Sequence, residues 1–106
     1  MDLNQVLIEV RDMADSLEFY EKLGLKLIVS AETYARFELP SGAATFSILL
    51  SDDPTPGGSV LYFEVDDVDG SFAALCERGI TFDSTPADQH YRWRTATFRD
   101  PAGNKL

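Results

Sequence analysis

Short stretches of alternating or consecutive apolar residues dominate the chain, and this pattern predicts β-strands separated by turns. The first half contains four such stretches, at Asn4–Val10, Leu25–Ala31, Thr33–Leu39 and Thr45–Leu50. The turn-forming residues Pro40, Ser41 and Gly42 separate the last two of them. The first half is therefore predicted to be rich in strands, with one interruption after the first of them.

The interruption, residues 12–24, has the pattern of an amphipathic helix. The apolar residues that recur on one helical face are Leu17, Tyr20 and Leu23. Asp15 and Glu18 have the spacing of a capping box. Gly24 suits the left-handed conformation that often ends a helix. The order of elements predicted for the first half is βαβββ.

The second half follows the same order less completely. Ser59–Val65 is expected to be a strand, and Asp67 or Asp69 is expected to cap a helix that ends at Gly79. The next segments are a strand at Ile80–Asp83, a polar loop at Thr85–Arg92 and a strand at Arg94–Arg99. By the repeat, a last strand should begin near Lys105, so the second half is expected to read βαββ, with its final strand missing.

The two halves are also related residue by residue. Val6–Val10 returns as Leu61–Val65, 55 positions further along the chain, and Ala35–Gly42 is matched by Ala96–Gly103, 61 positions further along. Two similar modules can form two similar half-sites. We therefore expect one α+β domain, residues 1–106, in which two βαβββ modules related by a pseudo-twofold repeat form a cup-shaped mixed sheet. The modules are residues 1–50 and 59–106, joined by a linker, residues 51–58, rich in proline and glycine.

The charge and composition of the chain indicate which kinds of molecule the protein binds. The formal net charge of −9 disfavours nucleic acids and anionic membranes and permits a cationic small molecule. No apolar run approaches the roughly 18–20 residues that cross a bilayer, and no secretory signal is visible. The one cysteine, Cys76, fits a reducing compartment. We expect a cytoplasmic protein with a small-molecule ligand and with neither a membrane nor a nucleic-acid partner.

Three groups of residues resemble the vicinal oxygen chelate superfamily, which includes glyoxalase I, bleomycin-resistance proteins and extradiol dioxygenases. They are Ser16–Leu25, Phe63–Val68, and Trp93 followed by Phe98–Asn104. The resemblance covers essentially the whole chain, but these are turn and packing residues, so they indicate the fold and not the chemistry. It implies paired βαβββ modules and a homodimer, in which modules of two chains often build one cup.

The resemblance also implies metal-ligand positions on the first and last strands of each module. The first-strand positions fall on Gln5 and on Val60, which cannot bind a metal; the residue before it, Ser59, is a poor ligand. The last strand of the first module, Ala43–Leu50, has no His, Asp, Glu or Cys, and the last-strand position of the second module falls past Leu106. A catalytic metal normally needs three protein ligands, so neither a metal nor another cofactor is predicted.

Strand parity indicates what replaces the metal. If Gln5 faces the cup, the residues that share its face are Leu7 and Glu9 in the first module and Val60, Tyr62 and Glu64 in the second. Two glutamates would then point into one cavity, where unpaired carboxylates favour a cation. Tyr62 and Trp93 would add stacking or cation–π contacts.

Two other interpretations of this pattern stay open. Each glutamate could pair with a local arginine, the candidates being Arg11, Arg92 and Arg94. A register error of one residue would reverse the faces of the strands. His90, the single histidine, is expected to be exposed in its polar loop and not to act as a general base.

The leading functional hypothesis is a metal-free binding protein similar to the bleomycin-resistance branch, which sequesters a cationic or aromatic ligand in an acidic cup and has no catalytic residue. The alternative is a metal-dependent lyase or isomerase resembling glyoxalase I, or a dioxygenase, with Glu9 or Glu64 as a carboxylate base. A third, weaker hypothesis is an accessory domain that has kept the fold and lost its site.

Overall fold

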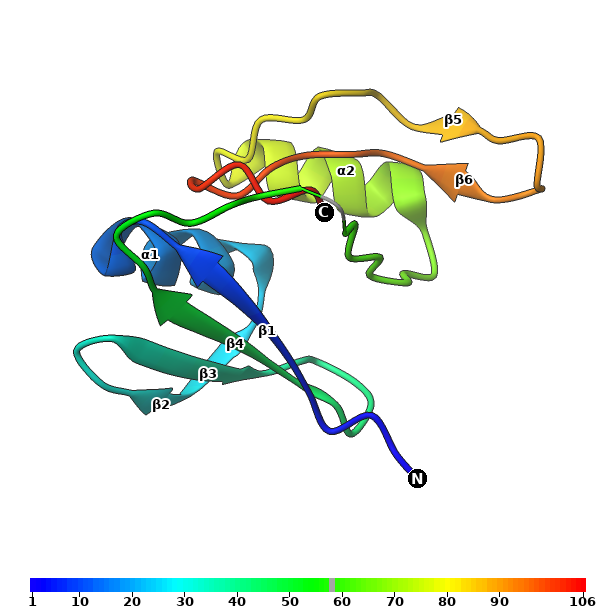
Figure 1. The fold of residues 1–106 in the computed structure, drawn as a ribbon. Helices are drawn as coiled ribbons and strands as arrows, with labels where there is room; N and C mark the ends of the chain where they lie inside the picture. Colours follow the sequence, from blue (N-terminus) through cyan, green and yellow to red (C-terminus); the bar gives the residue numbers. More distant parts are fainter. Residues whose placement is uncertain (58) are drawn as a thin grey trace.

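Four strands of the first half form one curved mixed sheet in the computed structural model (Figure 1). They are β1 (Gln5–Val10), β2 (Lys26–Ser30), β3 (Tyr34–Glu38) and β4 (Thr45–Leu50). Their order is β1-β4-β3-β2, with β1 parallel to β4 and the other neighbours antiparallel. The structure describes residues 1–57 and 59–106. The four strands predicted for the first half are confirmed, each bound lying within one residue of its prediction.

Helix α1 (Met13–Leu23) follows β1 and covers one face of this sheet (Figure 1). Asp12 caps the helix, because its carboxylate accepts a hydrogen bond from the amide of Asp15 at 2.9 Å. The predicted capping box at Asp15 and Glu18 is therefore wrong, since the helix begins about one turn earlier. Gly24 has a φ of 106°, which confirms the left-handed conformation expected at the end of the helix.

The core lies between α1 and the sheet and continues into the second half of the chain. Tyr20 of the helix is fully buried, and the centroid of its ring is 4.7 Å from that of Phe46 and 5.9 Å from that of Phe37. Side chains of β1 that pack into this core are Val6, Ile8 and Val10. Alternation along the strand then directs the other β1 side chains away from α1.

Helix α2 (Val68–Glu77) is the main element of the second half (Figure 1). Its cap is Asp67, whose carboxylate accepts a hydrogen bond from the amide of Gly70 at 3.1 Å. Of the two caps considered for this helix, Asp67 is therefore correct and Asp69 is not. Gly79 follows the helix with a φ of 95°, a conformation that glycine adopts without strain.

A short antiparallel hairpin, β5 (Ala87–Asp88) and β6 (Arg94–Thr95), extends from the second half (Figure 1). Two predictions need correction here. The loop expected at Thr85–Arg92 contains β5, and the strand expected at Arg94–Arg99 is regular only over β6.

The rest of the second half is held by isolated bridges, which join Val60 to Lys105, Phe82 to Phe98, and Arg99 to Lys105. Continuous strands at Ser59–Val65 and Ile80–Asp83 were expected from the apolar pattern, and both predictions are wrong, since a single residue of each segment is bridged. A strand persists only where a neighbouring strand pairs its backbone groups.

The final strand of the second half, expected to be missing, is present at its first positions. Lys105 is bridged to Val60 on one side and to Arg99 on the other. Leu106 and Phe98 exchange two backbone hydrogen bonds, of 3.1 and 3.0 Å. The predicted starting point near Lys105 therefore agrees with the pairing in the structure.

The segment that connects the two halves runs over one edge of the sheet (Figure 1). It corresponds to the linker predicted at residues 51–58, of which Gly58 lies outside the described residues. Pro54 of this segment is buried, so the connection packs against the fold in part. Neither helix in the described part of the chain has the length and apolarity needed to cross a membrane.

Candidate ligand-binding face

The face of the first sheet that is turned away from α1 carries three of the predicted ligand-binding residues. Strand pairing and parity place on it Gln5, Leu7 and Glu9 from β1, Thr45, Ser47 and Leu49 from β4, and Tyr34, Arg36 and Glu38 from β3. We call these nine residues the open face. Leu7, near its middle, is 44% exposed, whereas Val10 on the core side of the same strand is fully buried. The open face is therefore accessible to a ligand.

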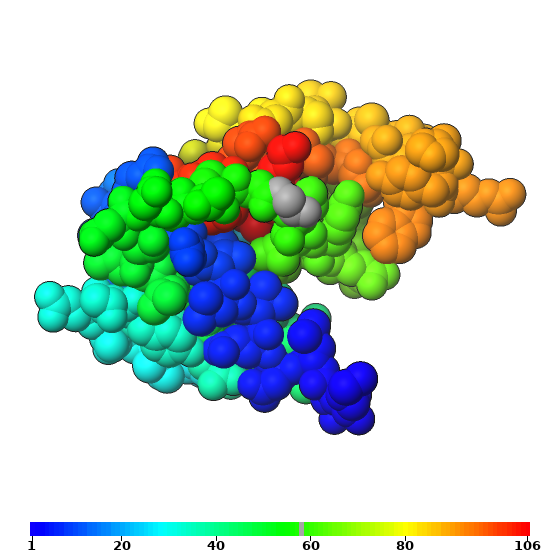
Figure 2. Space-filling model, in the orientation of Figure 1, coloured from blue at the N-terminus to red at the C-terminus, as the bar shows by residue number. Residues whose placement is uncertain are grey.

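The molecular surface is hollowed near the N-terminal strand. In the space-filling view, the first residues of the chain (blue) and the β5–β6 hairpin (orange) project on either side of a broad recess (Figure 2). A separate, small hollow of about 150 Å³ lies where the halves meet, and its lining includes Glu9, Leu61, Asn104 and Lys105. That volume is below the roughly 300 Å³ of small ligand pockets, so a ligand of ordinary size needs the broader recess.

Gln5 sits in a network of hydroxyl groups on the open face. Its Oε1 atom accepts a hydrogen bond from the Tyr34 hydroxyl at 2.8 Å and another from the Ser47 hydroxyl. The two hydroxyls are themselves 3.0 Å apart. Tyr34 and Ser47 thus fix the Gln5 side chain, and both lone-pair directions of its carbonyl oxygen are already occupied.

Arg36 lies beside this network, half-buried. Its Nε donates to Oγ1 of Thr45 at 2.8 Å, and its Nη2 donates to Oδ1 of Asn4 at 3.0 Å. Both acceptors are uncharged. The guanidinium is therefore held in place by neutral groups at the end of the open face where β1 begins.

The two glutamates of the predicted acidic cup are both exposed. Glu9 lies on the open face. Glu64 has the parity of Tyr62, while the residues of opposite parity, Leu61 and Phe63, pack against the core. The four ion pairs found among the described residues include neither glutamate.

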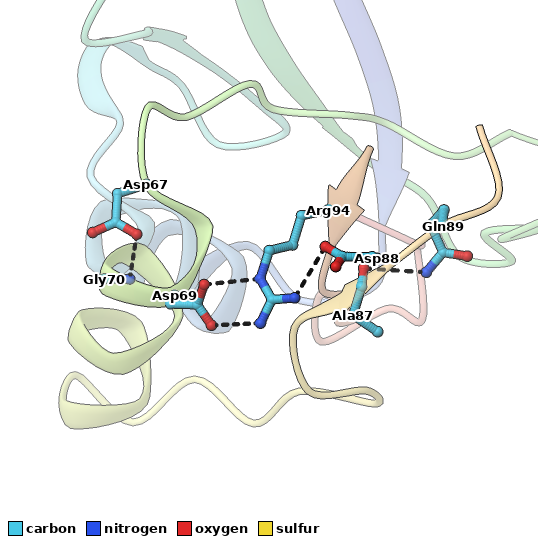
Figure 3. Close-up of polar contacts among 7 residues, drawn as sticks. All are labelled: Asp67, Asp69, Gly70, Ala87, Asp88, Gln89 and Arg94. Atoms are coloured by element: carbon cyan, nitrogen blue, oxygen red, sulfur yellow. Dashed lines mark hydrogen bonds and ion pairs between the residues drawn. The ribbon is translucent and has the colours of Figure 1, made fainter. Parts of the chain in front are cut away.

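Arg94, considered above as a partner for a glutamate, binds two aspartates instead (Figure 3). Its Nε and Nη2 each donate to one oxygen of Asp69 at 2.8 Å, and its Nη1 donates to Asp88 at 3.1 Å. The hydrogen bonds from Arg94 hold the pKa of Asp69 below its usual value. This contact joins the start of α2 to the β5–β6 hairpin. Arg94 is therefore not the ion-pair partner of Glu9 or Glu64.

Aromatic side chains gather at the hairpin. The ring centroid of Trp93 lies 6.4 Å from that of Tyr62 and 6.4 Å from that of Tyr91, with interplanar angles of 81° and 64°. All three side chains are about half exposed or more, Trp93 at 60%. His90, whose ring centroid is 4.9 Å from that of Tyr91, is exposed as expected. The structure thus brings together Tyr62 and Trp93, and Tyr91 is a neighbour that the sequence reasoning missed.

The donor set does not fit a catalytic metal. Among residues 1–57 and 59–106, no three His, Cys, Asp or Glu side chains come together in a group that could hold a metal ion. Gln5 has its carbonyl oxygen engaged by Tyr34 and Ser47, and Val60, the second position considered, is 40% exposed and has no donor atom. These residues do not provide the three ligands that such a metal needs.

Six of the nine open-face residues were not among the predicted site residues, and they include Tyr34, Arg36 and Ser47. A signal for the first two was present, since polar residues alternate with buried Ala35 and Phe37 along β3. Ser47 is a polar residue between two apolar ones in β4, and it is fully buried within the network. The alternation of residues along each strand therefore indicates which side chains share the open face. The contacts between them depend on the order of the strands in the sheet.

Comparison with known proteins gives one family. The model of the glyoxalase/bleomycin resistance protein/dioxygenase superfamily matches residues 2–106. A curated relative, "Uncharacterized protein YraH" of Bacillus subtilis (strain 168), is 32% identical over 122 aligned positions, which cover 100% of this chain and 95% of the relative.

Solved structures share the fold. A glyoxalase/bleomycin resistance protein/dioxygenase from Nocardioides superposes with a TM-score of 0.83 at 24% identity, covering 99% of this chain and 80% of that one. A member of the same superfamily from Sphaerobacter thermophilus DSM 20745 gives a TM-score of 0.79 at 25% identity, covering 99% and 93%. One from Burkholderia phytofirmans PsJN gives 0.79 at 22% identity, covering 99% and 94%.

Proposed function

This chain belongs to the glyoxalase/bleomycin resistance protein/dioxygenase superfamily, and within it we propose a metal-free binding protein that sequesters a small cationic, partly aromatic molecule. The observation that carries this proposal is the exposed aromatic group formed by Trp93, Tyr62 and Tyr91. Because the two tyrosine rings stand steeply to the indole, ring faces and edges are both presented to a molecule near Trp93. Ring faces attract cations through their quadrupole.

Charge supports a cationic ligand. The chain carries a formal net charge of −9, and Glu9 and Glu64 are exposed without an ion pair among the described residues. An acidic field raises the local concentration of a cation near the aromatic group. Tyr62 and Glu64 are two residues apart and both exposed, so the aromatic and acidic contributions are neighbours along the chain.

The test uses the fluorescence of Trp93, which is the only tryptophan in the chain. Choline is titrated against the protein, and dimethylbutanol, its uncharged carbon isostere, is titrated in parallel. We expect saturable quenching or a spectral shift with choline and none with the isostere. Replacing Tyr62 by leucine should weaken choline binding about three- to tenfold, the range of a partly exposed cation–π contact.

Matched variants separate the acidic contribution from net charge. Glu64→Gln should weaken choline binding, and Glu21→Gln, which makes the same charge change on α1, should not. Equal responses to choline and its isostere would overturn the cationic specificity. About one equivalent of nickel, zinc, manganese or iron in the purified protein, measured by elemental analysis, would overturn the metal-free assignment and favour a lyase or dioxygenase.

We further propose that the two halves are copies of one βαβββ module. Three correspondences support this. Asp12 and Asp67, 55 positions apart, cap their helices in the same way. The backbone hydrogen bonds that end the two helices, from Leu25 to Tyr20 and from Ile80 to Leu75, are also 55 positions apart. The pairing of Leu27 with Phe37 in the first sheet corresponds to the bridge between Phe82 and Phe98.

Association with a second copy is also proposed, together with a cytoplasmic location suggested by the single cysteine. Exposed apolar side chains, including Leu7, Val60 and Tyr62, give such an association a surface to bury. Light scattering coupled to size exclusion measures the mass in solution. A mass of one chain at all concentrations up to the millimolar range would contradict the dimer.

A further inference from the structure

Arg36 is a charged group whose bonded partners are all neutral. It donates to Thr45 and Asn4, and its Nη1 has no hydrogen-bond partner in the described part of the chain. None of the ion pairs among residues 1–57 and 59–106 includes Arg36. Glu38 lies on the same face two residues along β3, but it is exposed and does not reach the guanidinium. A half-buried guanidinium in this state retains its capacity for an anionic partner.

Gln5 offers a second donor close by. Its carbonyl oxygen is engaged by the hydroxyls of Tyr34 and Ser47, and its amide nitrogen has no hydrogen-bond partner among the described residues. Gln5 and Glu38 are both paired with Thr45 in the sheet, and Arg36 bonds the Thr45 hydroxyl. The Gln5 side chain and the guanidinium of Arg36 therefore both lie next to Thr45.

The donors are also held rigidly. Arg36 is fixed at Nε and Nη2, and Gln5 is fixed by two hydroxyl groups. Preorganised donors lose little conformational entropy when a ligand binds. Donors alone, one of them charged, match a planar oxyanion and do not match a cation or an apolar group.

We propose that Arg36 and the amide of Gln5 bind a carboxylate of the ligand, and this inference rests on the ligand-binding function proposed above. Glu9 stands at the opposite end of β1, four residues from Gln5, or roughly 13 Å at the rise of a β-strand. The half-buried Arg36 and the exposed Glu9 therefore lie toward opposite ends of one face, with the exposed Glu38 beside Arg36. The ligand class is amphoteric, with a carboxylate at the Arg36 end and a cationic group toward Glu9.

The test is a titration with benzoate, read by two-dimensional NMR at the side-chain Nε–Hε signal of Arg36 and the side-chain amide of Gln5. Benzamide, nearly identical in shape and uncharged, is the control ligand. We expect saturable shifts at both side chains with benzoate and at least tenfold weaker binding of benzamide. A bond between charged groups is worth about this factor.

Two variants test the subsite, one by removing the charge of Arg36 and one by giving Arg36 a competing carboxylate. Arg36→Gln deletes the charge and should weaken benzoate binding about tenfold or more. Asn4→Asp leaves Arg36 in place and puts a carboxylate where Asn4 now accepts from Nη2, so it should compete with benzoate and weaken binding to a similar extent. Arg11→Gln, at an exposed position after β1, makes the same charge change as Arg36→Gln and should leave benzoate binding unchanged.

Equal affinity for benzoate in the wild type, Arg36→Gln and Asn4→Asp would overturn the carboxylate subsite, and so would equal binding of benzamide. The choline titration at Trp93 is independent of this result. Choline binding without benzoate binding overturns the subsite and leaves the proposed function standing. Benzoate binding without choline binding supports the subsite and overturns the cationic ligand, and absence of both overturns the two together.

Discussion

The hydroxyl of Tyr20 donates a hydrogen bond of 2.7 Å to the carboxylate of Asp100, a residue 80 positions further along the chain. Both side chains are buried. The same carboxylate accepts hydrogen bonds from the amides of Ala102 and Asn104 and from the Asn104 side chain, which also donates to the backbone of Glu9. One buried carboxylate therefore joins α1, the turn at 100–104 and β1. This gives the Asp-Pro-Ala-Gly-Asn sequence a structural role, which explains why it indicates the fold and not the chemistry.

Removing the tyrosine hydroxyl should be costly. Tyr20→Phe leaves Asp100 without one of its buried donors, and we expect it to lower the free energy of unfolding by about 1–3 kcal/mol. Urea unfolding measures this. Tyr91→Phe is the matched control, because that side chain is 48% exposed, and its effect should stay within about 0.5 kcal/mol. Equal effects of the two substitutions would contradict the role given to the Tyr20–Asp100 bond.

The same bond predicts a dependence of stability on alkaline pH. Burial, and then the charge and hydrogen bond of Asp100, raise the pKa of Tyr20 above its ordinary value of 10.0. Since the folded-state pKa is the higher one, the stability that this group contributes is complete below pH 10. It is lost as the pH rises further, with a slope of at most about 1.4 kcal/mol per pH unit.

Tyr20→Phe should remove that slope. Unfolding free energies of the wild type and the variant are measured from pH 7 to pH 11, and their difference should be constant up to about pH 10 and shrink above it. A difference that stays constant across the whole range would show that Tyr20 ionises alike in the folded and unfolded chains.

The limits of sequence reasoning differ between the two halves. Along β3 the alternation of Tyr34, Arg36 and Glu38 with buried residues predicts a strand, and β2 and β4 pair with it on both sides. Ser59–Val65 is also rich in β-branched and aromatic residues, yet only Val60 of it is bridged. Pairing with a neighbour decides whether such a segment becomes regular, and one segment's own pattern does not contain that information.

The candidate site shows the same limit. Parity placed Gln5, Leu7 and Glu9 on one face, which agrees with the pairing in the sheet. The contacts of Gln5 with Tyr34 and Ser47 span 29 and 42 residues and arise from the order β1-β4-β3. No short motif encodes that order, so the network around Gln5 could not be predicted from the residues alone.

A buried hydroxyl offers a stabilising substitution. Ser16 is fully buried in α1, and its Oγ atom has no hydrogen-bond partner in the described structure. An unpaired buried hydroxyl costs free energy, so Ser16→Ala should raise the free energy of unfolding by up to about 1 kcal/mol. Ser84→Ala is the control, because the Ser84 hydroxyl bonds both the side chain and the amide of Thr97 at 3.0 Å. That variant should be neutral or destabilised, and a Ser16→Ala protein less stable than the wild type would contradict the prediction.

The last prediction concerns the two hydrogen bonds that Arg94 donates to the carboxylate of Asp69. Hydrogen bonds from Arg94 lower the pKa of Asp69, so the stabilising contribution of this carboxylate is present above its ordinary value of 3.8 and is lost as the pH falls through its folded-state value. Arg94→Gln should move the pKa of Asp69 upward, toward the ordinary value, because a neutral amide cannot replace the charged two-point contact. A carbon-detected NMR titration of the Asp69 carboxyl measures this. Arg99→Gln removes an arginine paired with Asp83 instead, at 2.9 Å, and should leave the Asp69 titration where it is. If both variants shift Asp69 equally, the net charge of the chain sets that pKa and the contact with Arg94 does not.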